Sequence, residues 1–189
     1  MSNKTTQKAT QEECEELVKQ SEAITGINPY DPTRPSTIRH LEISQIIAGA
    51  HNFVHPYFIN GMITGKSDQA QSLLRSGREG ALRNRIPDRA VMKDLFDELV
   101  DEIKIACEKM ADWTNDEKDA FAWDVHHRFV CLHPFKDGNE RTARLFLNHI
   151  RLLMGRPLLI ILDSEAESYF SAIADYRERK FIPTYMKGV

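Results

Sequence analysis

The sequence predicts a mainly α-helical bundle with one irregular insertion. Apolar residues recur at three- and four-residue spacing along most of the chain, helix start and stop signals bracket these segments, and strand-like alternation is rare. At 189 residues the chain is long enough to bury a core as one ordinary domain. Its 41% hydrophobic and 28% charged content is typical of a folded protein.

The first helix is expected after the polar residues 1–9. Thr10 and Glu13 have the spacing of a capping box, in which each side chain bonds the backbone N–H of the other. Gly26 is expected to end this helix. Its predicted apolar face consists of Cys14, Leu17, Val18, Ser21 and Ile24.

A proline-rich connector, "INPYDPTRPS", leads to a second helical segment over residues 36–52. The stretch at residues 61–88 is irregular, because it carries four glycines and many polar side chains. We expect loops or a small hairpin there.

The second half of the chain is predicted to be almost entirely helical. One helix begins at Asp88, with an apolar stripe at Val91, Leu95, Leu99, Ile103 and Cys107. The next begins near Thr114, three residues before Glu117, and runs through "DAFAWDVHHRFVCL".

Two further helices complete the prediction. The first is "RTARLFLNHIRLLM", which should end at Gly155 because glycine and the nearby Pro157 are stop signals. The short "LLIIL" that follows fits either a strand or part of a buried helix. The last helix is "SEAESYFSAIADYRERK".

Composition also narrows the function classes. A net charge of −3 offers no basic surface for nucleic acid. The three cysteines, Cys14, Cys107 and Cys131, are expected to be buried thiols, since they are odd in number and lie among apolar residues. His126 and His127 fall on different helix faces, which disfavours a zinc site. Without a leader or membrane-spanning run, the chain is expected to be cytoplasmic.

A dense group of polar residues lies between two predicted helices, in "HPFKDGNERTAR" at residues 133–144. Pro134 disfavours helix at His133, so His133 should be the last residue of the preceding helix. Gly138 permits a tightly bent backbone, and Asn139 is suited to cap the next helix.

The start of that next helix has the features of a phosphate site. Backbone N–H groups at a helix N-terminus attract anions. Arg141 and Arg144 share one face, and guanidinium groups bind phosphate oxygens in pairs. Asp137 can hold magnesium, and His133 has the pKa range of a general base. Each residue alone fits a solvated turn equally well, but together they favour a nucleotide polyphosphate held beside a proton acceptor.

This stretch resembles the signature of Fic domains, H-P-F-x-(D/E)-G-N-G-R-x-x-R. Asp137 fills the acidic position, and the flanking "HHRFVCLHPF" and "TARLFLNHIRLLMGRPLL" look like the family's helices. The resemblance implies a Fic-type helical bundle with a short flap or hairpin insertion, divided into an N-terminal segment, 1–35, and a Fic domain, 36–189. The fixed positions that match are His133, Pro134, Phe135, Gly138, Asn139, Arg141 and Arg144.

The resemblance further implies transfer of AMP from ATP to a Ser, Thr or Tyr hydroxyl of a target protein. By this analogy His133 deprotonates the hydroxyl, and Asp137 holds Mg²⁺ between the α- and β-phosphates. Arg141 and Arg144 hold the β- and γ-phosphates.

Three other motif residues receive supporting roles from the same analogy. Asn139 and the N–H groups of the loop around Gly138 stabilise charge on the α-phosphate. Phe135, which follows Pro134, anchors the loop in the core. The protein is expected to come from a bacterium. Whether it forms a homodimer is left open by the sequence.

Glu140 departs from the signature, which usually has Gly at this position. A related branch, the Doc-like kinases, has Lys there and transfers the γ-phosphate. An acidic residue in the first helical turn stabilises the helix but places negative charge beside the phosphates. Three alternatives follow: attenuated AMP transfer, Doc-like phosphotransfer, or a degenerate fold that binds a protein or a nucleotide without turnover.

A second departure lies in "SEAITG", from Ser21 to Gly26. Many Fic proteins carry an inhibitory helix with (S/T)-x-x-x-E-(G/N), whose Glu pairs with the second motif arginine. Here Thr25 replaces that Glu, so a degenerate inhibitory helix and a plain amphipathic helix explain the stretch equally. One hypothesis is that Glu140 pairs with Arg144 instead.

The irregular stretch occupies the position of the family's flap, which aligns a target segment by strand addition. "LLRSGREGALRNR" is basic and contains glycine, as suits a mobile docking edge, although a solvated loop is the alternative.

Overall fold

The computed structural model describes residues 9–24, 86–134 and 139–186, and within these ranges the all-α prediction is confirmed, with helices and no strand. The expected helix at 36–52, the proline-rich connector and residues 61–85 of the irregular stretch, with its flap, lie outside the described residues. The elements are α1 (Gln11–Ile24), α5 (Arg89–Lys109), η2 (Met110–Asp112), α6 (Asn115–Leu132), α7 (Asn139–Leu153), η3 (Asp163–Glu165), α8 (Ala166–Tyr176), the π-helical turn η4 (Arg177–Phe181) and α9 (Ile182–Tyr185).

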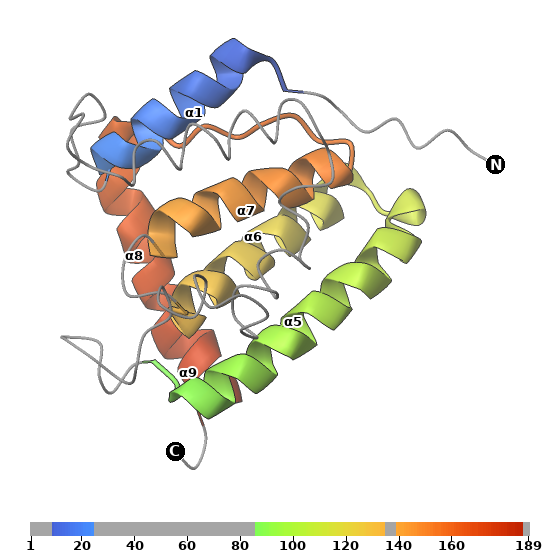
Figure 1. The fold of residues 1–189 in the computed structure, drawn as a ribbon, viewed down its shortest axis with the longest axis vertical. Coiled ribbons are helices and arrows are strands. Elements are labelled where there is room, and N and C mark those ends of the chain that lie inside the picture. The colour runs from blue at the N-terminus through green and yellow to red at the C-terminus, as the bar shows by residue number, and fades with distance from the viewer. Residues whose placement is uncertain (1–8, 25–85, 135–138, 187–189) are drawn as a thin grey trace, which may run out of the picture.

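Helices α5, α6 and α7 lie side by side, and α6 and α7 run antiparallel (Figure 1). The C-terminal end of α6 therefore meets the N-terminal end of α7, and α8 crosses the bundle at this end. Helix α1 lies over α7 and contacts it. The two helices that flank the motif thus meet at the end of the bundle that α8 crosses, and α1 lies over α7.

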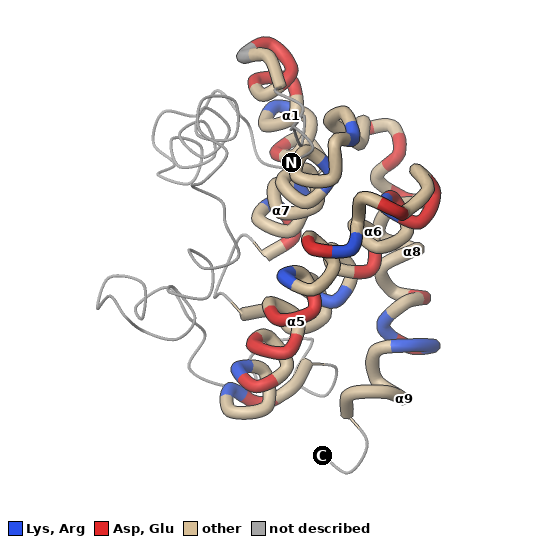
Figure 2. The backbone as a smooth tube through the Cα atoms, turned by 90° about the vertical axis from the view of Figure 1, so that its right-hand side faces the viewer, with Lys and Arg blue, Asp and Glu red and all other residues tan. Residues whose placement is uncertain are grey.

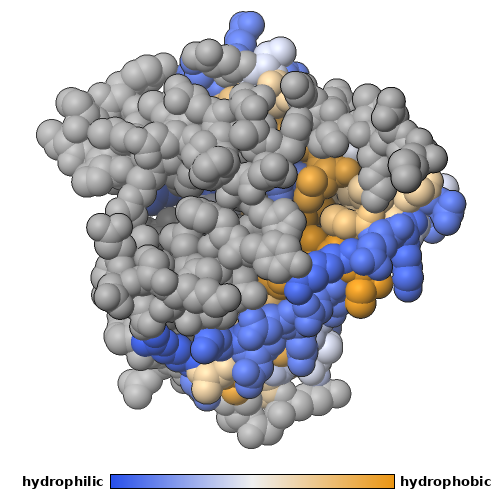
Figure 3. All heavy atoms as spheres, turned by 45° about the vertical axis from the view of Figure 1, so that its right-hand side comes forward, coloured by the Kyte–Doolittle hydropathy of each residue, from blue (hydrophilic) through white to orange (hydrophobic). Residues whose placement is uncertain are grey.

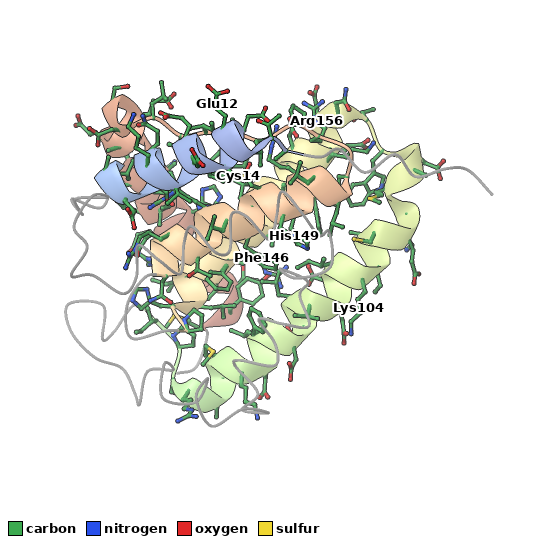
Figure 4. The ribbon with its side chains drawn as sticks, turned by 45° about the horizontal axis from the view of Figure 1, so that its top comes forward. Glu12, Cys14, Lys104, Phe146, His149 and Arg156 are labelled. Atoms are coloured by element: carbon green, nitrogen blue, oxygen red, sulfur yellow. The ribbon has the colours of Figure 1, made fainter. Side chains whose placement is uncertain are left out.

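A row of aromatic rings, one from each central helix, lies within the hydrophobic core of the bundle. The ring of Phe129 on α6 lies 6.0 Å from that of Phe96 on α5 and 5.6 Å from that of Phe146 on α7. Both pairs meet edge to face, which adds to the hydrophobic gain from burial. Figure 4 shows Phe146 on the side of α7 that faces α5.

Both predicted capping boxes are confirmed. The Thr10 N–H donates to Glu13 Oε2 at 2.7 Å, and the Glu13 N–H donates to Thr10 Oγ1 at 3.2 Å. Thr114 and Glu117 repeat the pattern at 2.7 and 3.3 Å. The predicted inner face of α1, from Cys14 to Ile24, is buried throughout, and Glu12 points away from the bundle in Figure 4.

The predicted stripe on α5 is partly wrong. Leu99 and Ile103 are buried as expected, but Val91, Leu95 and Cys107 are only half-buried. A strict four-residue repeat turns about 40° per step around a helix with 3.6 residues per turn, so it drifts off the core face. The face that the structure buries mixes three- and four-residue steps, through Met92, Phe96, Leu99, Val100, Ile103 and Ala106.

The outer face of α5 is hydrophilic, as the blue band in Figure 3 shows. Acidic residues occur repeatedly along α5 and on α1 (Figure 2). Among the described residues, no helix is both long and apolar enough to cross a membrane.

Cys14 and Cys131 are buried thiols, as predicted, and Cys107 is half-buried. Burial raises the pKa of Cys14 to about 11 and that of Cys131 to about 12. Neither thiol is therefore a reactive nucleophile near neutral pH.

Helix α7 ends at Leu153, and Gly155, the predicted stop signal, follows two residues later with a φ of 71°. The Arg156 N–H donates to the Arg151 carbonyl at 2.8 Å and the Gly155 N–H to the Leu152 carbonyl at 3.1 Å, the two bonds of a Schellman motif. A left-handed residue is required here, which explains the glycine.

The expectation of a strand or helix at "LLIIL" is wrong, because residues 156–162 form neither. The side chain of Asn148 on α7 bonds this segment instead. Its Nδ2 donates to the Leu159 carbonyl at 3.0 Å, and its Oδ1 accepts from the Leu159 N–H at 2.7 Å. One buried amide thus satisfies the pair of backbone groups that a neighbouring strand would satisfy.

Replacement of Asn148 by alanine is expected to lower the free energy of unfolding by about 1–3 kcal/mol, since both Leu159 groups lose their partners. Urea denaturation measures this change. Glu167→Ala, at an exposed position on α8, is the control and should change stability by less than about 0.5 kcal/mol. An Asn148→Ala protein as stable as the parent would show that the two bonds contribute nothing.

Candidate functional site

His133 lies at the C-cap of α6, as predicted from Pro134. Its backbone is left-handed, with φ 48° and ψ 57°, and its N–H donates to the Phe129 carbonyl at 3.2 Å. A non-glycine residue in this conformation costs about 1–2 kcal/mol, and such strained residues cluster at functional sites. Pro134 is buried, whereas Phe135, Asp137 and Gly138 lie outside the described residues.

The N-terminal end of α7 carries the other candidate residues. The sequence predicts Asn139 to be the N-cap of this helix, but the structure makes it the first helical residue. The two assignments differ by one position. Asn139, Arg141 and Arg144 are all nearly inaccessible to solvent, with exposed fractions of 1%, 3% and 1%. Guanidinium groups are rarely buried so completely unless they are paired. The hydrogen-bond partners of Arg144 therefore determine what its guanidinium is free to bind.

All three nitrogens of the Arg144 guanidinium donate hydrogen bonds. Nε donates to Ser21 Oγ at 2.8 Å and Nη2 to the Ser21 carbonyl at 2.6 Å. Nη1 donates to the Tyr169 hydroxyl at 3.1 Å, and the guanidinium carbon lies 5.2 Å from the centre of the Tyr169 ring. Arg144 thus joins α7 to both α1 and α8.

Ser21 belongs to the last turn of α1, where backbone carbonyls have no partner within the helix. Arg144 satisfies one of these carbonyls and places a positive charge at the negative end of the α1 dipole. A second contact holds α1 in place, because the Asp163 N–H in η3 donates to Gln20 Oε1 at 2.9 Å. Thr25 and Gly26 lie outside the described residues.

Glu140 lies in the first turn of α7 and is half-exposed. The hypothesis that it pairs with Arg144 is wrong: within the described part of the chain no ion pair joins the two, and the Arg144 nitrogens donate to Ser21 and Tyr169. Burial raises the pKa of Tyr169, Arg144 lowers it, and the charge of Glu140 adds to the rise. Glu140 is therefore close enough to act on this group electrostatically.

Sequence reasoning missed Tyr169 as a partner of Arg144. The two are 25 residues apart on different helices, and nothing in the local pattern of α8 marks this tyrosine. The sequence offers His126 only as a candidate zinc ligand, yet it is fully buried and its Nε2 lies 3.0 Å from the Tyr169 hydroxyl. His127 is half-buried, which confirms that the two histidines occupy different faces.

This end of the bundle has the parts of an anion site. Two arginines and a helix N-terminus supply positive potential, and His133, a residue type that can act as a base, lies at the neighbouring helix end. The arginine donor set suits phosphate oxygens rather than a bare metal ion. In the described ranges no group of His, Cys, Asp and Glu is arranged to bind a metal, and Asp137, the expected magnesium ligand, lies outside them.

Residues 54–150 match the family model described as Fic/DOC family. This stretch is just over half of the 189 residues and includes α5, α6 and most of α7. The chain belongs to the Fic/DOC family. Helix α1 lies outside the matched stretch, so the match says nothing of its role.

Curated relatives of this Fic-family chain are named protein adenylyltransferases. The fic-1 protein of Caenorhabditis briggsae is 44% identical over 70 residues, 33% of this chain and 14% of the relative. The Caenorhabditis elegans protein is 42% identical over 69 residues, again 33% and 14%. The Fic protein of Nematostella vectensis is 44% identical over 50 residues, 26% and 12%.

The chain thus spans about a seventh of the length of these relatives. These relatives come from animals, so they give no support to the predicted bacterial source. No solved structure matches the chain significantly.

Proposed function

We propose that this chain is a protein nucleotidyltransferase, in which the Fic domain at residues 36–189 transfers AMP from ATP to a Ser, Thr or Tyr hydroxyl of a target protein. The observation that carries the proposal is the buried guanidinium of Arg144 at the start of α7, within the stretch that matches the Fic/DOC family. The names of the curated relatives support the same activity.

The proposed reaction needs one base and several positive groups. His133 accepts the proton of the target hydroxyl as its oxygen forms a bond to the α-phosphorus, and the bond from that phosphorus to the β-phosphate oxygen breaks. Pyrophosphate leaves. Arg141 and Arg144 hold the β- and γ-phosphates, and Asn139 with the N–H groups around Gly138 stabilises the α-phosphate. Asp137 would hold Mg²⁺, which neutralises phosphate charge when bound.

The intact mass of the full chain after incubation with ATP and Mg²⁺ tests the proposal. A gain of one AMP, on this chain or on a target protein, supports the transferase. A gain of one phosphate indicates a Doc-like reaction, the alternative that the residue at position 140 raises. Calorimetry that detects no ATP binding, together with no gain of mass, would favour the degenerate binding fold instead.

We further propose that α1, within the N-terminal segment 1–35, is an inhibitory helix that acts through Ser21 rather than through residue 25. The two Ser21 oxygens occupy Nε and Nη2 of Arg144, which form the edge with which arginine binds phosphate in a bidentate way. ATP and α1 would therefore compete for this edge.

Displacement of α1 is expected to raise the affinity for ATP about tenfold or more. Leu17→Asp places a carboxylate where α1 buries Leu17, and the cost of burying this charge disfavours docking. Calorimetry with ATP and Mg²⁺ measures the affinity, and faster proteolysis of α1 shows that it has undocked. Ser21→Ala, which leaves the carbonyl bond intact, should give a smaller rise.

Glu12→Ala, at an exposed position on α1 that points away from the bundle, is the matched control and should change neither property. The inhibitory role is wrong if α1 undocks in Leu17→Asp while the affinity for ATP stays at the parent value.

A further inference from the structure

A buried chain of polar groups connects Arg144 to the interior of the bundle. Arg144 Nη1 lies 3.1 Å from the Tyr169 hydroxyl, which lies 3.0 Å from His126 Nε2. Arg144 is 1% exposed, His126 is fully buried, and Tyr169 is 6% exposed. The chain crosses three helices, from α7 to α8 to α6, and the proposed chemistry assigns no role to its two inner members.

The direction of these hydrogen bonds follows from what each group can donate. A guanidinium carries only donors, so the Tyr169 oxygen accepts from Arg144. The Tyr169 O–H can then donate to His126 Nε2, which requires a neutral imidazole with its proton on Nδ1. His126 Nδ1 has no partner among the described residues.

The opposite tautomer is less favourable. If Nε2 carried the proton, both the Tyr169 O–H and the Nδ1 lone pair would lack partners, whereas the first arrangement leaves only the Nδ1–H without one. Each unsatisfied buried group costs about 1–3 kcal/mol. Burial lowers the pKa of His126 well below its usual value, and the charges of His127 and Arg144 lower it further. His126 is thus a neutral acceptor.

The two partners of Arg144 hold different parts of the guanidinium. Ser21 bonds Nε and Nη2 from α1, whereas Tyr169 bonds Nη1 from within the bundle and places its ring 5.2 Å from the guanidinium carbon. When α1 leaves, the Tyr169 bond and the ring contact remain. Both would keep the freed edge pointing where the Ser21 oxygens had been.

We propose that Tyr169 and His126 are positioning residues that fix the Arg144 guanidinium, so that its Nε and Nη2 edge is presented to the polyphosphate of a nucleoside triphosphate. This inference rests on the proposed function and adds two residues that act through Arg144. Tyr169 orients the guanidinium directly, and His126 orients the Tyr169 hydroxyl by accepting its hydrogen bond. A fixed guanidinium loses less conformational freedom when it binds phosphate.

Tyr169→Phe tests the inference, because it removes the hydroxyl and keeps the ring. Calorimetry with ATP and Mg²⁺, on the full chain with and without Leu17→Asp, should show a Kd about tenfold higher in Tyr169→Phe. The Kd for AMP should not change, because AMP lacks the phosphates that Arg144 is proposed to hold. Tyr176→Phe is the control: its hydroxyl lies on the same helix but donates to Asp124 at 2.9 Å, and ATP affinity should stay at the parent value.

A double-mutant cycle separates positioning from general structural damage. In an Arg144→Met background, Tyr169→Phe should have no further effect on ATP affinity, because its route to the nucleotide is already gone. A further loss in that background, or an unchanged Kd in Tyr169→Phe alone, would overturn the inference.

Nitrogen-15 NMR of the His126 ring tests the arrangement without any nucleotide. We expect the Nδ1–H tautomer, and a changed Nε2 shift in Tyr169→Phe; the Nε2–H tautomer would overturn the inference. If these signals are as expected and no variant binds ATP, the proposed function fails and the nucleotide role of Tyr169 fails with it. That outcome differs from one in which the parent binds ATP and Tyr169→Phe binds it equally well.

Discussion

Replacement of His133 by alanine is expected to slow AMP transfer by about 100- to 10,000-fold, the usual contribution of a general base. His133 ends α6 beside the buried start of α7, and the proposed reaction assigns the proton transfer to it. Affinity for ATP should change by less than about threefold, since the arginines remain. Initial rates from intact mass, beside calorimetry, separate these two effects.

The left-handed backbone of His133 provides a stability control for this experiment. Glycine adopts φ near 48° without strain, so His133→Gly should be at least as stable to urea as the alanine variant. His133→Asn also tolerates this conformation and lacks a base of suitable pKa. All three variants should lose transfer whatever their stability. Transfer that survives in any of them would remove His133 from the mechanism.

Replacement of Glu140 by glycine is expected to raise ATP affinity and AMP transfer by up to about a thousandfold. Like charges at about 4 Å cost about 4 kcal/mol at an effective dielectric near 20, which corresponds to that factor in affinity. The structure shows that Arg144 does not neutralise this charge, because no ion pair within the described residues joins the two. Calorimetry and autoadenylylation beside the parent measure the change.

Glu140→Gln separates charge from steric hindrance, since it removes the charge and keeps the side chain. If charge dominates, the glutamine variant should recover most of the gain; if the β-carbon blocks close approach, only glycine should. Glu140→Gly should also cost about 1 kcal/mol of stability, because glycine is a poor helix former and the helix N-terminus loses an acidic residue. Equal affinity and equal rates in parent, Gln and Gly proteins would show that Glu140 has no effect.

The structure changes how α1 is understood. The family pattern directs attention to residue 25, where threonine replaces the expected glutamate, and suggests that the clamp on the second arginine is lost. The contact is instead made four residues earlier, by the hydroxyl and the carbonyl of Ser21. A backbone carbonyl leaves no mark in a sequence, so the sequence pattern indicated Glu140 as the acid that replaces residue 25.

The sequence alone determined the features that depend on neighbours along the chain. Capping boxes at Thr10 and Thr114, the end of α6 before Pro134 and the stop at Gly155 each involve backbone groups within a few residues. The family signature was equally readable, because its residues occupy one short stretch. Local hydrogen-bonding and dihedral preferences are strong enough to specify such features without the rest of the fold.

Only the tertiary structure decided which groups share a partner across the bundle. Asn148 replaces the strand that "LLIIL" suggested, and Arg144 brings together Ser21 and Tyr169 from 123 residues before it and 25 after it. These contacts depend on how the helices pack around the aromatic core, and many sequences could bring different side chains to the same places. Because Arg144 is buried, its guanidinium must have hydrogen-bond partners, and the packing of the helices determines which groups these are.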